Sequence, residues 1–162
     1  MATARDKRPF SRRVFEAALI IVVLPIVLPL ALIGLILHTL NRIVVYLLVW
    51  VWWLPRGKDV LFVSSESTVW GEYMETQILP LVRDRATVLN WSERNKWPKW
   101  SFAVRVFRTF GRGRDHTPMV VIFQPFRRAR IFRFLQAFKD FKHGHTENVE
   151  QLRRELMLAL GR

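Results

Sequence analysis

The chain has 162 residues, of which 51% are hydrophobic, and it carries a formal net charge of +13. It contains no cysteine, which excludes disulfide bonds, thiolate zinc sites, iron–sulfur clusters and a cysteine nucleophile. Residues 55–162, which follow the apolar part of the sequence, are enough for one small domain with its own core and too few for two.

A basic N-terminal arm (residues 1–16) precedes a long apolar segment. Residues 17–37 are apolar throughout and would form about 31 Å of helix, which matches the hydrocarbon core of a bilayer. Polar residues 38–42 lead into a second apolar run, residues 43–54, which is rich in tryptophan and too short to span. We therefore predict a membrane anchor over 17–54, with the span at 17–37 and an interfacial or returning segment at 43–54.

Two topologies are compatible with this anchor. In the first, a single helix crosses the bilayer, the basic arm stays in the cytoplasm and the domain lies on the far side. In the second, Pro25 and Pro29 help the chain to turn back as a re-entrant hairpin, so that the arm and the domain share the cytoplasmic face. The second topology leaves Arg42 below the interface, at roughly 2.5–3.5 kcal/mol unless it pairs or snorkels. We favour it modestly, because both the arm and the domain are basic and suit the anionic cytoplasmic leaflet.

Two export signals are the alternatives to a retained anchor. The apolar run is longer than that of a secretory signal peptide, and no small-residue cleavage site follows it. Residues 11–15 resemble the start of a twin-arginine signal, but Glu16 departs from that pattern and the run behind it is very hydrophobic.

Behind the anchor, short β-branched and aromatic runs alternate with helical patterns. Strands are predicted at 59–64, 86–91 and 118–123, and helices at 70–82, 98–110, 127–142 and from 146 onward. This order predicts an α/β domain, a small three-stranded parallel sheet covered by helices that resembles half of a Rossmann-like or flavodoxin-like fold. The likeness concerns architecture alone and implies no activity.

Polar residues follow all three predicted strands. In open parallel sheets ligands bind outside the carboxyl ends of the strands, so we expect these residues to share one edge. Ser65 and Ser67 lie beside a predicted helix start, where backbone N–H groups suit a phosphate or carboxylate, and Glu66 with Glu93 suits acid–base chemistry. Polar surface loops give the same pattern without any ligand, and the usual nucleotide-binding signatures are missing, so no cofactor is predicted. The candidate ligand-binding residues are Ser65, Glu66, Ser67, Asn90, Ser92, Glu93, Arg94, Gln124 and Arg127.

The cationic residues are concentrated in one part of the domain. Between Arg94 and Arg133, eleven Lys and Arg stand against Asp115 alone. The predicted helices 98–110 and 127–142 each combine an apolar stripe, which suits the domain core, with a row of arginines. Together with Trp97 and Trp100, these arginines predict a surface laid against anionic headgroups. The membrane-surface candidates are Arg105, Arg108, Arg112, Arg114, Arg128, Arg130 and Arg133.

Three short motifs suggest other chemistry without supporting it. The segment 111–114 looks like an RG nucleic-acid motif but occurs once and follows a helix, so nucleic acid is not the expected partner. His143, His145 and Glu147 have no further ligands nearby in the sequence, so no metal site is predicted. Asp115–His116 has no recognisable nucleophile motif beside it.

These observations predict a membrane-anchored accessory or scaffolding domain. It would lie on an anionic bilayer and bind a protein partner or form part of a membrane complex. The alternative is an enzyme that acts on a lipid-linked or phosphate-bearing substrate at the strand ends, and the sequence leaves open whether the chain is an enzyme. A third possibility is an assembly role in which the membrane segment itself contacts a partner helix.

Overall fold

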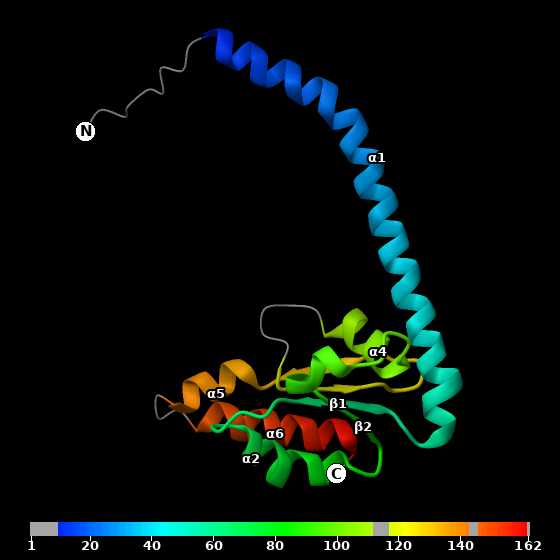
Figure 1. Ribbon diagram of the computed structural model, residues 1–162, viewed down its shortest axis with the longest axis vertical. Coiled ribbons are helices and arrows are strands. Elements are labelled where there is room, and N and C mark those ends of the chain that lie inside the picture. The colour runs from blue at the N-terminus through cyan, green and yellow to red at the C-terminus, as the bar shows by residue number, and fades with distance from the viewer. Residues whose placement is uncertain (1–9, 112–116, 143–145, 162) are drawn as a thin grey trace, which may run out of the picture. The chain divides into compact units, whose positions relative to one another are not determined.

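The computed structural model describes residues 10–111, 117–142 and 146–161, with the backbone alone given for 10–22 and 142 (Figure 1). By its internal contacts the chain divides into two compact units, Met1–Arg42 and Ile43–Arg162. The second unit, called the sheet unit below, therefore begins twelve residues before the domain boundary expected at residue 55.

Helix α1 (Phe10–Leu48) runs without a break and contains both Pro25 and Pro29. With the turn that follows it, the segment Val23–Arg56 is long and apolar enough to cross a membrane, and its side chains from Val23 to Val44 are exposed. The turned-back hairpin is not formed between Phe10 and Leu48. The polar stretch 38–42 holds neither glycine nor proline, and Thr39 Oγ1 bonds the Leu35 carbonyl at 2.8 Å, so the helix continues through it.

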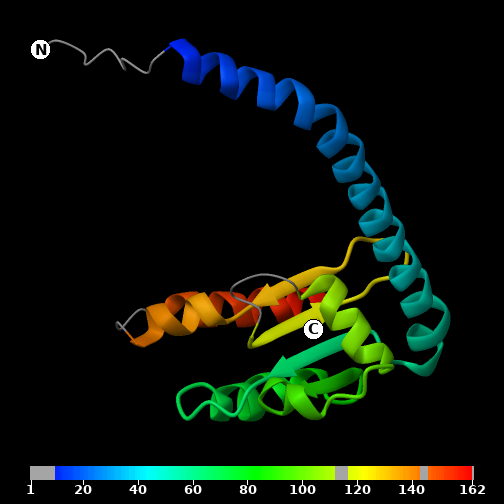
Figure 2. The ribbon, with the colours of Figure 1, turned by 45° about the horizontal axis from the view of Figure 1, so that its top comes forward.

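The sheet has four strands in the order β2-β1-β3-β4 (Figure 2). Strand β1 (Val60–Ser64) pairs parallel with β2 (Ala86–Asn90) and antiparallel with β3 (Met119–Ile122), which pairs antiparallel with β4 (Arg130–Arg133). The alternation of strands and helices agrees with the predicted α/β class. The prediction of a three-stranded parallel, Rossmann-like sheet is wrong, because β3 runs in the opposite direction and a fourth strand is present.

Strand β4 occupies the start of the segment predicted as helix 127–142. In Arg-Ile-Phe-Arg, Phe132 is buried against one face of the sheet while Ile131 packs on the other, which is the period-2 pattern of a strand. Helix α5 (Leu135–Lys142) begins only after this strand.

Helices cover both faces of the sheet (Figure 1). On one face, Val60, Phe62 and Val120 pack against α2 (Gly71–Tyr73), the π-helical turn η3 (Met74–Ile78), α3 (Leu79–Val82), α5 and α6 (Glu147–Leu160). On the other face, Leu61, Val63, Met119 and Val121 pack against α4 (Phe102–Phe110) and against residues 43–54. All five residues of β1 are buried, so neither face can be left open.

Residues 43–54 form one wall of this second core. The segment comprises the last turns of α1, the π-helical turn η1 (Val49–Trp53) and Leu54. Val45, Val49 and Trp53 recur every fourth residue and are at most 8% exposed, which fits a helical stripe packed on the sheet. The segment predicted as interfacial or returning therefore contributes its inner side to the domain core.

The buried stripe generates a matched pair of variants. Val49 is fully buried and Val51, two residues on, is 74% exposed. We expect Val49→Ala to lower the free energy of unfolding of the sheet unit by about 2 kcal/mol, because two methyl groups are lost from a closed core, and Val51→Ala to change it by less than about 0.5 kcal/mol. Thermal unfolding of the full chain in detergent, followed by tryptophan fluorescence, measures both. Equal effects of the two substitutions would place residues 43–54 outside the core.

Candidate functional site

The carboxyl ends of β1 and β2 meet at one edge of the sheet, as their parallel pairing requires, with Ser64 opposite Asn90. Two hydrogen bonds join the loops behind them, and a third lies within the loop that follows β2. The Asn90 side-chain amide donates to Glu66 Oε1 at 2.7 Å, and the Glu66 backbone N–H donates to Ser92 Oγ at 2.9 Å. The Ser92 N–H donates in turn to Asn90 Oδ1 at 2.9 Å. Three of the candidate ligand-binding residues are thus brought together, in contact with one another.

The serines at the end of β1 shape a turn. The Ser67 N–H donates to the Ser65 carbonyl at 2.7 Å, and Ser67 Oγ accepts from the Val69 N–H at 3.3 Å. Because the Ser67 hydroxyl closes the local turn, and α2 is only three residues long, the pattern of serines before a helix is explained by backbone geometry.

The remaining residues of this edge have separate partners. Glu93 forms an exposed ion pair with Lys96 at 3.1 Å, whereas Glu66 bonds Asn90. The Arg94 guanidinium lies over the Trp91 ring at 5.2 Å. The two carboxylates expected to cooperate as acid and base are therefore each engaged with a different neighbour.

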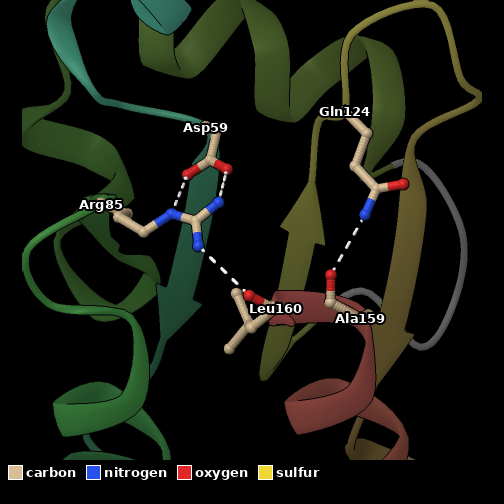
Figure 3. A network of polar contacts seen from close by, with 5 residues as sticks. All are labelled: Asp59, Arg85, Gln124, Ala159 and Leu160. Carbon is tan, nitrogen blue, oxygen red and sulfur yellow. Dashed lines mark hydrogen bonds and ion pairs between the residues drawn. The ribbon is translucent and has the colours of Figure 1, made fainter. Parts of the chain in front are cut away.

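Gln124 and Arg127 lie at the opposite edge of the sheet. Because β3 is antiparallel to β1, its carboxyl end lies beside the amino end of β1, where the Phe123 N–H donates to the Asp59 carbonyl at 2.8 Å. The prediction that all three strand ends share one edge is wrong for this reason. Gln124 Nε2 donates to the Ala159 carbonyl at 3.1 Å, and the Arg127 carbonyl accepts the Tyr46 hydroxyl (Figure 3 shows the Gln124 bond).

A polar network around Gln124 fastens the end of α6 to the sheet (Figure 3). Arg85 Nε donates to Asp59 at 2.9 Å, its Nη2 forms an ion pair with the same carboxylate, and its Nη1 donates to the Leu160 carbonyl at 3.4 Å. Hydrogen bonding to Asp59 raises the pKa of Arg85 and keeps the guanidinium charged. With Gln124 on Ala159, two carbonyls left unpaired by the helix end receive donors.

A second tie holds α6 to η3 and α2. The Tyr73 hydroxyl donates to Glu150 Oε1 at 3.4 Å. Burial, and then the negative charge of Glu150, raise the pKa of Tyr73 above 10.0, so the hydroxyl stays protonated as a donor. Both polar ties thus serve to position a helix.

The hollow beside Glu66 does not suit an anionic substrate. It has a volume of about 370 Å³, and its described lining holds three carboxylates and no Lys or Arg. Among the residues that the structure describes, no group of three or more His, Asp or Glu is placed to hold a metal ion. The histidine motifs at 116, 143 and 145 lie outside the described residues. The lining of the hollow is Glu66, Ser67, Thr68, Gly71, Glu72, Glu75 and Thr76.

The membrane-surface candidates fall into three groups. Arg105 and Arg108 project from the outer side of α4 and are exposed, and Arg128 is exposed in the loop before β4. Arg130 and Arg133 are exposed on β4, at the free edge of the sheet, where charges also discourage pairing with a further strand. Arg112 and Arg114 lie outside the described residues. The second basic helix is therefore replaced by a basic edge strand and loop.

The most exposed aromatic side chains lie close to these cations. Trp100 is 97% exposed and Phe126 is 90% exposed, whereas Trp97 is half-buried and its ring N–H donates to the Asn90 carbonyl at 3.0 Å. Trp100 was predicted from the sequence to face the headgroups, whereas Phe126 was not. The turn signal of Pro125 followed by two arginines after Phe126 was the available clue.

No protein family model, no curated protein and no solved structure matches the chain.

Proposed function

We propose that the chain is a membrane-anchored accessory domain, in which α1 crosses the bilayer and the sheet unit lies against anionic headgroups and binds a protein partner. One observation carries the proposal: the outer side of residues 43–54 is apolar and open while the inner side belongs to the core. The open residues are between 45% and 74% exposed. They are Ile43, Val44, Leu47, Val51 and Trp52, called the apolar strip below.

Helix α4 places cationic side chains beside the apolar strip. Its first residue, Phe102, stacks on Trp52 at 5.8 Å, and its last, Phe110, contacts Tyr46 at 5.8 Å, so α4 packs along the segment at both ends. Exposed Arg105 and Arg108 therefore belong to a helix that packs along the segment that carries the strip. An apolar strip with arginines next to it is the composition of a surface that lies at the headgroup boundary, where each cation contributes about 1 kcal/mol.

The continuous helix supports the first topology, a single crossing. A single crossing puts the arm and the sheet unit on opposite sides of the bilayer. We keep the cytoplasmic placement of the sheet unit as part of the proposal, because its cationic surface suits the anionic cytoplasmic leaflet. The basic arm favours the reverse orientation, in which the arm lies in the cytoplasm, and cysteine labelling distinguishes the two orientations.

The absence of cysteine makes the topology directly measurable. We expect a cysteine at Ala4 and one at Glu155, introduced singly in the full chain, to react with a membrane-impermeant maleimide from opposite sides of the membrane. Intact cells should label Ala4→Cys, and lysed cells should label both. Labelling of both variants from the same side would contradict the single crossing. Labelling of Glu155→Cys alone in intact cells would reverse the orientation.

Contact with anionic lipid is tested by an environment-sensitive fluorophore. In nanodiscs that contain anionic lipid, we expect a fluorophore on Arg105→Cys of the full chain to shift to the blue relative to nanodiscs of zwitterionic lipid, and high salt to reverse the shift. The same fluorophore on Glu155→Cys is the matched control, since Glu155 is exposed on α6, across the sheet from α4. An equal response at the two positions would contradict the proposal.

The protein partner has the opposite face of the sheet unit available. There a hollow of about 260 Å³ lies between α2, η3 and α5, and it includes Val69 and Phe141, which are 46% and 44% exposed. We expect a protein to co-purify with the full chain in mild detergent, to be lost with Phe141→Glu, and to be retained with Arg105→Gln. Purification of the chain alone, or equal recovery from both variants, would remove the partner from the proposal.

A further inference from the structure

The loop Gln124–Arg128, called the Phe126 loop below, presents a large apolar side chain to solvent in a disfavoured backbone conformation. Phe126 has φ of 57°, in the left-handed region that bulky residues rarely adopt, and its side chain is 90% exposed. The left-handed backbone conformation costs free energy, and so does the exposure of the Phe126 ring to water. Such features are kept where a ligand or surface uses them.

Contacts on both sides hold the Phe126 loop in place. On the sheet side, the Phe123 N–H bonds the Asp59 carbonyl at 2.8 Å, and the Gln124 side chain bonds the Ala159 carbonyl at 3.1 Å. On the other side, the Tyr46 hydroxyl donates to the Arg127 carbonyl, and the Phe126 ring contacts the Trp50 ring at 5.1 Å. The loop is therefore a fixed projection, attached to the same segment that carries the apolar strip.

The chemistry of the projection matches one kind of surface. Phe126 lies against Trp50, the neighbour of Val51 in the apolar strip, and exposed Arg127 and Arg128 follow it directly. If the Phe126 ring lay below the headgroups, Arg127 and Arg128 would lie at the level of the phosphates. The ring would then be in an apolar environment and the two guanidinium groups in an anionic one. Charge complementarity thus points to an anionic lipid surface as the occupant.

We propose that Phe126 is a bilayer insertion anchor: its ring enters the acyl region of the leaflet, while Arg127 and Arg128 bind lipid phosphates. This inference rests on the proposed function and deepens it, since it names the side chain that penetrates and the groups that stop it from going deeper. The inserted Phe126 ring thus sets the depth at which the Phe126 loop lies in the leaflet.

Depth-dependent quenching tests the anchor. Three variants of the full chain carry one fluorophore each, at Phe126→Cys, Arg128→Cys and Glu155→Cys, in nanodiscs with anionic lipid and nitroxide lipids labelled either at the headgroup or at a shallow acyl carbon. We expect residue 126 to be quenched at least twofold more by the acyl nitroxide than by the headgroup nitroxide. Residue 128 should show the reverse order, and residue 155 should be quenched by neither.

The outcomes separate the two proposals. Quenching of 126 and 128 alike by the headgroup nitroxide overturns insertion and leaves the membrane-surface function standing. Absence of quenching at both positions overturns both. A blue shift at 126 without quenching by either lipid indicates a protein in contact with the loop and overturns the lipid assignment.

A second variant guards against effects of the fluorophore itself. With the fluorophore at 128, Phe126→Ser should lower headgroup quenching severalfold if the ring anchors the loop, and Phe126→Leu should retain it. Tryptophan fluorescence of each variant in detergent reports whether the sheet unit is still folded. Equal quenching in the serine and leucine variants of folded protein would overturn the anchor.

Discussion

Strand β1 has no solvent-facing side, and the rest of the structure follows from the need to cover both of its faces. Its residues Val60 to Ser64 are all buried, so one layer of helices on each side is required. One layer is formed entirely by elements that follow β1 in the sequence, namely α2, η3, α3, α5 and α6. The other layer is completed only by residues 43–54, which contribute Val45, Val49 and Trp53 to the core. Residues 43–54 are therefore part of the sheet unit's own core, and the fold of the sheet unit begins with them.

This shared core determines which surfaces remain open. Once the stripe of Val45, Val49 and Trp53 faces the sheet, the helical period turns Val44, Leu47 and Val51 outward. The same packing brings Phe102 and Phe110 of α4 against residues 43–54, leaves Arg105 and Arg108 of α4 exposed, and brings Phe126 into contact with Trp50. A single packing arrangement, that of residues 43–54 on the sheet, thus determines the exposure of the apolar strip and the positions of α4 and of the Phe126 ring.

The sequence predicted elements better than it predicted their relations. The apolar run, the first three strands and the final helix have recognisable composition, and the edge formed by Glu66, Asn90 and Ser92 followed correctly from the parallel pairing of β1 and β2. The direction of β3 left no trace, because a strand buried on both faces is apolar whichever way it runs. Four residues, Arg130 to Arg133, are too few to separate a period of 2 from 3.6. The direction of β3 is what places Gln124 and Arg127 at the edge opposite to the predicted one. The left-handed backbone conformation of Phe126 has no signature in the sequence, because glycine and asparagine are the residues that usually mark such a position.

The polar residues at the sheet edges form hydrogen bonds within the fold, and these bonds account for their presence. Ser67 closes a turn, Gln124 and Arg85 satisfy the carbonyls at the end of α6, and Glu66 bonds Asn90 across two loops. Each buried or half-buried polar group that finds a partner in this way stabilises the fold, and each would have to be removed from that task to bind a substrate. Packing inside the sheet unit explains the apolar strip and Phe126 only in part. Trp52 stacks on Phe102 and Phe126 contacts Trp50, but the strip residues are 45% to 74% exposed and Phe126 is 90% exposed, which is unfavourable in water. The apolar strip and Phe126 thus remain the features that the fold alone does not explain, and the proposed membrane-surface function would account for them.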